Sequence, residues 1–356
     1  MAVIYKNRDY CLLDHRQFIS SVYKNTLTDE NELKSLSMVA KLFSILNVDK
    51  QQSNRKRSHN SENFQEETAI VKGIYQRLIQ EVPSNIKDSL VSKYKLLDTS
   101  DVRDLSKQLF EATIFDFMGV KGGNNNNFLI PPNSRYCYRS KNYFTFFYYK
   151  IQFLFYCGCV KEQCLKLDGC KFDILIADPP WWNKYIRRLK SANDKLSYSM
   201  MYNEDIAAIP VQNLLSENCL VAVWCTNAPS NIAAVKNIIF PRWGVDYLAT
   251  WYWLKVTVDL QTICDFGAGS KKQPYERIIL GKVGDVNDVS DCQLVVSVPS
   301  ALHSHKPPLL DLLTPYVKTE NPQTLELFAR YLMPNTTSVG FEPLKWQHES
   351  LYEEVT

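Results

Sequence analysis

The sequence predicts an α/β protein whose main domain is a doubly wound sheet, preceded by a small helical domain. Two observations lead to this prediction. From residue 172 onward, short apolar runs alternate with stretches of helical periodicity, and this alternation is typical of a doubly wound sheet. Before residue 120 the recurring pattern is helical. A turn-forming Gly/Asn-rich segment at 121–128 separates the two parts.

The first part, residues 1–120, is interpreted as a helical domain for binding nucleic acid or a partner. Asp29, with Glu32 three residues later, is a plausible helix cap. The polar segment 51–64 contains Arg55-Lys56-Arg57 and is predicted to be a linker. This basic tripeptide fits a nuclear-import signal or an RNA contact, but the favoured interpretation is a solvated loop. Apolar spacing predicts helices over 29–47, 65–81, 84–97 and 101–118.

The second part, residues 129–349, is interpreted as the catalytic domain. Its buried-strand candidates are 172–177, 219–225, 247–254, 276–281, 293–298 and 336–341. Helical stretches are predicted near 203–215, 228–239, 307–313 and 321–332. No Gly-x-Gly-x-x-Gly follows an early strand, so a nicotinamide dinucleotide site is not expected.

Composition limits the class of protein. The chain has 41 Lys and Arg against 38 Asp and Glu, a net charge of +3, so any contact with nucleic acid must come from local basic residues. Ten cysteines without a secretory signal are typical of reduced thiols in an intracellular protein. The most apolar stretch, 143–157, is too short to span a membrane. We expect neither a membrane role nor a metal site.

The strand candidate 172–177 runs directly into Asp178, Pro179, Pro180 and Trp181. Neither proline has a backbone N–H, and each forces the preceding residue into an extended conformation. The result is a stiff loop at the carboxyl end of a strand, where open α/β sheets bind ligands. The Asp178 carboxylate and the Pro179 carbonyl can each accept one N–H of an exocyclic amine, while Trp181 can stack on a flipped base. The loop favours amine methylation; a proline-rich strand end with an aromatic plug is the structural alternative.

Further motifs follow in a recognisable order. They are Ile130-Pro131-Pro132-Asn133-Ser134-Arg135, Tyr198-Ser199, Trp224-Cys225-Thr226-Asn227, Trp251-Tyr252-Trp253-Leu254-Lys255, Lys272-Gln273-Pro274-Tyr275-Glu276, Ser304-His305-Lys306-Pro307-Pro308 and Leu325-Glu326-Leu327-Phe328-Ala329-Arg330. With the loop at 178–181, this set resembles the eukaryotic N6-adenine methyltransferase family over about two-thirds of the chain. The resemblance implies S-adenosylmethionine as methyl donor, a Rossmann-like fold with permuted motif order, and adenine in nucleic acid as substrate.

The resemblance also implies roles for single residues. Tyr198 and Lys255 match positions that line the substrate pocket in the family, and Asp178 serves both the amine and the donor. Arg330 closes a strand-and-turn and matches the arginine that contacts the donor ribose. The residues implied in donor binding are Asp178, Lys306, Arg330 and Glu342. Arg187 and Arg188 follow the catalytic loop and suit a phosphate backbone, although an exposed basic loop without a ligand fits them as well.

Two departures from the family pattern concern the donor site. The family carries Gly-Asn-Glu near the carboxyl end, where this chain has Gly340-Phe341-Glu342. The second departure is the aromatic segment 141–152, where the family has a short strand that ends in an acidic residue. We hypothesise that 141–152 is an insertion of one isoform that impairs donor binding; a divergent aromatic strand is the alternative.

Several alternatives stay open at the level of sequence. The resemblance implies RNA as substrate, with an internal 2′-O-methyladenosine of U2 small nuclear RNA as the target in one subgroup, and a nuclear location that could extend to the cytosol. Methylation of DNA is the first alternative, because a flipped adenine presents the same edge from either polymer. A catalytically silent RNA-binding scaffold is the second. The need for a partner subunit stays open, and a monomer is compatible with the sequence.

Overall fold

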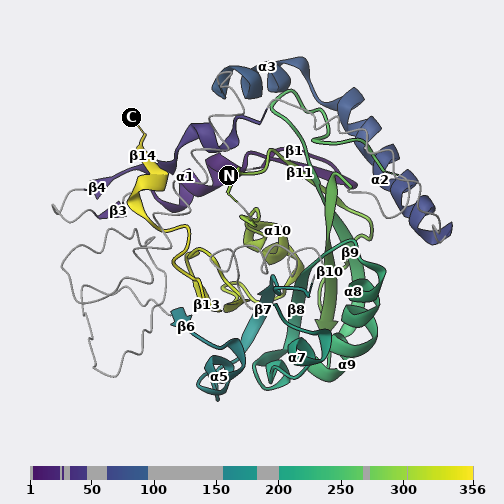
Figure 1. The fold of residues 1–356 in the computed structure, drawn as a ribbon, viewed down its shortest axis with the longest axis vertical. Helices are drawn as coiled ribbons and strands as arrows, with labels where there is room; N and C mark the ends of the chain where they lie inside the picture. The colour runs from purple at the N-terminus through teal and green to yellow at the C-terminus, as the bar shows by residue number, and fades with distance from the viewer. Residues whose placement is uncertain are drawn as a thin grey trace, which may run out of the picture.

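A mixed sheet forms the framework of this computed structural model, which describes residues 3–24, 26–27, 33–45, 62–94, 155–182, 200–267, 273–302 and 304–355. Within these residues ten strands form the sheet, in the order β1-β2-β11-β9-β10-β8-β7-β12-β13-β6 (Figure 1). Their bounds are β1 Val3–Lys6, β2 Tyr10–Leu13, β6 Phe155–Cys157, β7 Phe172–Ala177, β8 Leu215–Cys225, β9 Asp246–Lys255, β10 Tyr275–Val283, β11 Leu294–Ser297, β12 Thr324–Leu327 and β13 Thr336–Gly340.

Most strands of the sheet point the same way. β6, β13, β12, β7 and β8 pair in parallel, as do β9, β11 and β2, whereas β10 is antiparallel to both β8 and β9. The carboxyl ends of β7, β8, β9, β11, β12 and β13 therefore meet at one edge, together with the amino end of β10. Ligands of α/β proteins bind at this kind of edge.

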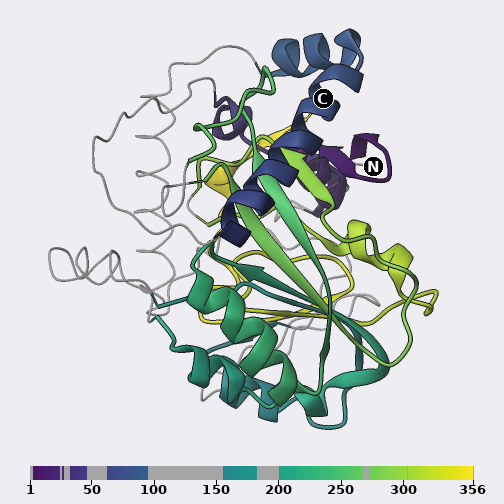
Figure 2. The same ribbon diagram turned by 90° about the vertical axis from the view of Figure 1, so that its right-hand side faces the viewer.

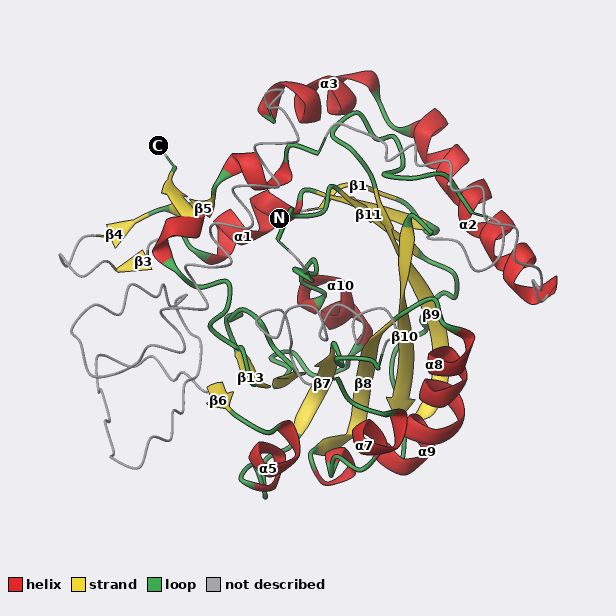
Figure 3. Cartoon of the chain, viewed as in Figure 1, coloured by secondary structure: helices red, strands yellow, loops and turns green. Residues whose placement is uncertain are grey.

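Helices cover both faces of the sheet (Figures 1 and 3). Along β7, Leu175 and Ala177 join one buried cluster and Ile174 and Ile176 another, because successive side chains of a strand point to opposite faces. The first cluster packs under α5, α7, α8 and α9, and the second packs under α10. The bounds are α5 Val160–Leu165, α7 Asn203–Ala207, α8 Pro229–Ala234, the π-helix η4 Val235–Ile239, α9 Phe240–Trp243 and α10 Leu310–Leu313, with 3-10 helices η3 Val211–Asn213 and η5 Thr314–Tyr316.

The N-terminal helices pack against β9, β10 and β11, and α2 lies alongside these strands (Figure 2). The Glu67 carboxylate of α2 pairs with Arg277 of β10. The elements of this part are α1 His15–Val22, β3 Thr26–Leu27, β4 Leu33–Lys34, β5 Leu36–Met38, the 3-10 helix η1 Ala40–Phe43, α2 Glu62–Glu81 and α3 Ser84–Lys93; at the other end of the chain lie the 3-10 helix η6 Glu349–Leu351 and β14 Tyr352–Glu354.

The predicted strands are confirmed, since each of the six lies within or overlaps an observed strand. The helices at 65–81 and 84–97 correspond to α2 and α3. Shorter helices occupy parts of 203–215, 228–239 and 307–313. The helix predicted over 101–118, the boundary at 121–128 and the segment 141–152 lie outside the described residues. No helix in the described part is both long and apolar enough to cross a membrane.

Two helix predictions are wrong. Residues 29–47 contain β4, β5 and η1, and β5 is fixed by pairing with β14, with Met38 opposite Tyr352; no local pattern reveals a partner more than 300 residues away. Residues 321–332 contain β12, which lies between β7 and β13. In addition, β1 and β2 join the main sheet, so the described N-terminal residues do not form the purely helical unit that the sequence predicted.

Candidate active site

The loop after β7 is fixed by backbone hydrogen bonds. The Asp178 N–H donates to the Leu327 carbonyl at 3.3 Å, which ties the loop to the end of β12. The Trp181 N–H donates to the Pro179 carbonyl at 2.8 Å and closes a three-residue turn around Pro180. The Pro180 carbonyl in turn accepts the Met201 N–H at 2.9 Å. The loop is therefore rigid, and one of the two lone pairs of the Pro179 carbonyl is occupied.

The Asp178 carboxylate lies between two cations. Arg330 Nη1 donates to Oδ2, and Lys306 Nζ lies 4.0 Å from Oδ1. Each cation comes two residues after a residue in the left-handed backbone region, namely Phe328 with φ 63° and Ser304 with φ 61°. Non-glycine residues adopt this conformation rarely and at a cost. These two sharp turns bring the cations to Asp178.

Lys306 also belongs to a second ion-pair group. The Glu276 carboxylate, at the amino end of β10, accepts hydrogen bonds from both Lys306 and Lys255. Burial disfavours the charge of Glu276, but the two ammonium groups outweigh it and hold its pKa well below the usual range. Burial likewise opposes the charge of Lys306, yet Asp178 and Glu276 raise its pKa above the usual value. Lys306 and Glu276 therefore both stay charged in the folded protein.

Glu342 extends the network on the far side of Arg330. Its Oε2 lies 3.8 Å from Arg330 Nε and 2.8 Å from Lys345 Nζ. Phe341, between the last residue of β13 and Glu342, is 54% exposed. A Cβ on Gly340 would lie only 2.9 Å from the Ala329 carbonyl oxygen, so glycine allows the end of β13 to approach the turn that carries Arg330.

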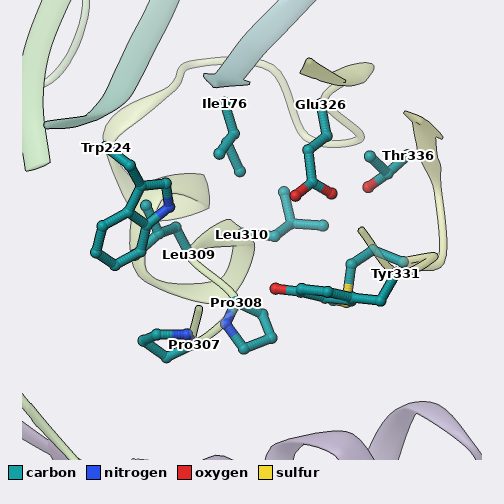
Figure 4. A pocket seen from close by; sticks show the side chains of 10 residues that line it. Ile176, Trp224, Pro307, Pro308, Leu309, Leu310, Glu326, Tyr331 and Thr336 are labelled. Carbon is teal, nitrogen blue, oxygen red and sulfur yellow. The ribbon is translucent and has the colours of Figure 1, made fainter. Parts of the chain in front are cut away.

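A pocket near the carboxyl ends of β7 and β8 contains a carboxyl group with an unusual pKa (Figure 4). Glu326 of β12 points into it, together with Trp224, Tyr331 and Thr336, above Pro307 and Pro308. Burial, and next the negative charge of Asp178, raise the pKa of Glu326 to about 8, although Arg330 acts against this. Glu326 is therefore largely protonated at neutral pH. The sequence analysis assigned Glu326 no catalytic or binding role.

Five of the predicted site residues meet at this edge of the sheet: Asp178, Lys255, Lys306, Arg330 and Glu342. Pro179 and Pro180 form the loop as predicted from their geometry. The predicted substrate residues Tyr198, Arg187 and Arg188 lie outside the described residues. Within the described part, no group of three or more His, Cys, Asp or Glu side chains is placed to hold a metal.

Trp181 does not lie where the sequence analysis placed it. Its side chain is 6% exposed, it packs among the core residues beneath the sheet, and its indole N–H donates to the Trp224 carbonyl at 2.9 Å. This burial argues against the predicted stacking on a base, because the turn at Pro180 directs the indole into the core. The aromatic residues near solvent are instead Trp182 and Tyr202. Solvent exposure distinguishes Trp182 and Tyr202 from Trp181, and the sequence alone does not reveal the exposure of a side chain.

Comparison with known proteins identifies a matching family and several relatives of this chain. The family model MT-A70 matches residues 172–342. The chain is 40% identical over 189 residues to the human N(6)-adenine-specific methyltransferase METTL4, a match that covers 50% of this chain but only 38% of the human protein. It is 30% identical to a DNA N6-methyl methyltransferase of Caenorhabditis elegans over 97% of this chain and 98% of that protein. An N6-methyladenosine RNA methyltransferase MTA1 of Cryphonectria parasitica is 34% identical over 51% of this chain and 55% of its own length.

Proposed function

Because the chain belongs to the MT-A70 family of S-adenosylmethionine-dependent methyltransferases, we propose that it transfers a methyl group to the N6 atom of adenine in a nucleic acid. The observation that supports this most directly is the rigid Asp178-Pro179-Pro180 loop, whose carboxylate is held at the carboxyl edge of the sheet by Arg330 and close to Lys306. The human relative is named an N(6)-adenine-specific methyltransferase, the fungal relative an N6-methyladenosine RNA methyltransferase, and the nematode relative a DNA N6-methyl methyltransferase.

The polar groups at this edge fit S-adenosylmethionine. Lys306 is a charged ammonium suited to the methionine carboxylate, and Arg330 and Glu342 offer a donor and an acceptor for ribose hydroxyls. The close approach of Gly340 to Ala329 keeps Arg330 and Glu342 near each other. When bound, S-adenosylmethionine supplies an electrophilic methyl group on a positively charged sulfur. In this proposal the catalytic loop precedes the donor-binding residues along the chain, which is the permuted order expected from the resemblance.

The loop's own contribution is to orient the amine. Oδ1 of Asp178 lies 4.0 Å from Lys306 Nζ, beyond hydrogen-bonding distance, so it can accept one N–H of the substrate. The Pro179 carbonyl has a second lone pair for the other N–H, since Trp181 takes only the first. Two such bonds aim the nitrogen lone pair, and positioning of this kind supplies much of an enzyme's rate. The proton can leave to solvent after the transfer, so Asp178 need not act as a strong base.

We propose RNA as the substrate polymer, in the nucleus, with an internal 2′-O-methyladenosine of U2 small nuclear RNA as the target that the resemblance suggests. Two fungal relatives are named N6-methyladenosine RNA methyltransferases. DNA is the second candidate, favoured by the nematode relative, whose match extends over nearly the whole chain. A silent RNA-binding scaffold is the third, since Phe341 occupies the place of a donor-binding asparagine.

Transfer of a labelled methyl group to adenine-containing RNA and DNA oligonucleotides tests the proposal. We expect activity on at least one polymer, and loss of it by at least about 100-fold in Asp178→Ala, because the variant loses an oriented acceptor. Calorimetry with S-adenosylhomocysteine shows whether the donor site is intact in both proteins. Donor binding without methyl transfer to either polymer would contradict the proposal and favour the scaffold.

A further inference from the structure

Two aromatic side chains lie beside the catalytic loop without belonging to the buried core. Trp182 is half-buried, and Tyr202 is 58% exposed. Their ring centroids are 6.0 Å apart with an interplanar angle of 19°, an offset stacked arrangement. Trp181, Trp224 and Trp253 at the same edge are all buried. A partly exposed pair of stacked rings next to a catalytic loop offers a flat apolar surface to a ligand.

Backbone hydrogen bonds fix this pair to the loop that carries Asp178. The Met201 N–H donates to the Pro180 carbonyl at 2.9 Å, and the Trp182 N–H donates to the Met201 carbonyl at 3.1 Å. The Tyr202 carbonyl accepts from the Asp205 and Ile206 N–H groups at the start of α7. The backbone of Trp182 and Tyr202 is therefore held by the loop and by a helix, and their rings stack on each other. A rigid surface of this kind loses little conformational entropy when a ligand binds.

The length of chain between Asp178 and Trp182 limits which part of a substrate can reach the pair. Four residues span at most about 14 Å when fully extended, and the turn around Pro180 shortens this distance. Consecutive bases along one strand are spaced by about 3.4 Å when stacked and lie further apart in an extended strand. A base held at Asp178 therefore places nucleotides within at most about four stacked positions of it, the adjacent one included, near Trp182 and Tyr202.

We propose that Trp182 and Tyr202 form the binding surface for the unpaired base that flanks the target adenine in a single-stranded nucleic acid. This inference rests on the proposed function and deepens it, because it assigns a subsite to the substrate strand. Every base has a π face, so stacking accepts different flanking bases and positions the strand without reading its sequence. The two residues are positioning residues, because they contact the neighbour of the reacting base.

The test measures binding of single-stranded oligonucleotides that contain one adenine, by fluorescence anisotropy, without methyl transfer. Each oligonucleotide is also made with an abasic nucleotide on either side of the adenine. We expect Tyr202→Ala and Trp182→Leu to weaken binding about 5- to 100-fold, as loss of one base–aromatic stack does, and Tyr202→Phe to retain it. One abasic position should weaken binding to the wild type and have no further effect in Tyr202→Ala, because the two changes remove the same contact.

Tyr247→Ala is the matched control. Tyr247 is also an exposed tyrosine, at 42%, but it lies near the opposite end of β9 from Lys255, about 26 Å along the strand. Its replacement should leave oligonucleotide binding unchanged. Binding of S-adenosylhomocysteine by each variant shows that the fold is intact.

The outcomes separate this inference from the proposed function. If the wild type methylates adenine but Tyr202→Ala binds and turns over substrate with unchanged Kd and KM, the subsite is refuted and the function stands. If the abasic effect disappears in Tyr202→Ala although no methyl transfer is found, the subsite stands and the function fails. Equal abasic effects in wild type and variant, or no oligonucleotide binding by the wild type, would overturn the inference.

Discussion

Glu276 and Lys306 form an ion pair beside the catalytic carboxylate. Lys306 Nζ donates to Glu276 Oε2 and lies 4.0 Å from Asp178 Oδ1. Lys255 donates to the other oxygen of Glu276, so a single carboxylate at the start of β10 holds the ammonium group of Lys255, at the end of β9, and that of Lys306, in the segment after β11. Glu276 therefore keeps two like charges together and limits how closely Lys306 approaches Asp178.

Replacing this carboxylate should destabilise the fold. In Glu276→Gln the two ammonium groups repel each other without compensation, and we expect the free energy of unfolding to fall by about 1–3 kcal/mol. Urea unfolding measures it. The control is Asp285→Asn, which removes the exposed pair with Lys318, where we expect no measurable change because solvent screens such pairs. An equal loss in both variants would mean that burial of the Glu276 pair adds nothing.

The buried histidine pair should make stability depend on pH. His15 and His305 stack with centroids 4.8 Å apart, and within the described part neither ring nitrogen of His15 has a hydrogen-bond partner. Burial lowers the pKa of His15 to about 3; burial, together with His15, lowers that of His305 well below its usual value. The unfolded chain, with histidine pKa values near 6.5, binds more protons below that pH. Stability should therefore fall as the pH decreases from about 6.5 toward 3, by up to about 1.4 kcal/mol per pH unit for each histidine.

Urea unfolding at pH 7.5, 6.5 and 5.5 measures this dependence. His15→Leu keeps an apolar side chain against Phe43 and removes one of the two titrating groups, so the slope below pH 6.5 should become smaller. An unchanged slope in the variant would show that His15 is protonated to the same extent in the folded and unfolded chains.

Trp181 should contribute to the stability of the fold. In Trp181→Phe the Trp224 carbonyl loses the indole N–H that reaches it at 2.9 Å, and the core loses part of a buried ring. We expect the free energy of unfolding to fall by about 1–3 kcal/mol, measured by urea unfolding. Tyr202→Phe, which alters an exposed ring and keeps its aromatic face, is the comparison and should lose much less. A variant as stable as the wild type would show that neither the bond nor the packing matters.

Six of the ten strands of the sheet were predictable because their apolar patterns are local. In β7, apolar residues fill both faces, and the loop chemistry of Asp178 and the prolines follows from the residues themselves. β12 was not predictable with the same certainty, since Leu325, Phe328 and Leu332 also fit helical spacing. Its place between β7 and β13 determines its conformation.

The sequence predicts several residues of the candidate site, but it does not predict which of them contact one another. The motifs point to Asp178, Lys306 and Arg330, but the pairing of Lys306 with Glu276 depends on β10 running antiparallel to its neighbours. Similarly, Trp181 and Trp182 are adjacent in sequence, and only the turn at Pro180 determines which of them enters the core.

The residue after β13 provides a test of the donor site. Phe341 is 54% exposed and precedes Glu342, which lies next to Arg330; the resemblance predicts an asparagine in its place. A phenyl ring neither donates nor accepts a hydrogen bond, whereas an amide does both. One additional hydrogen bond is worth about 1 kcal/mol, or roughly fivefold in affinity. We therefore expect Phe341→Asn to bind S-adenosylhomocysteine about five times more tightly than the wild type, as measured by calorimetry. Phe341→Leu, which removes the ring without adding an amide, should show no gain, and equal affinities of the Asn and Leu variants would mean that residue 341 does not contact the donor.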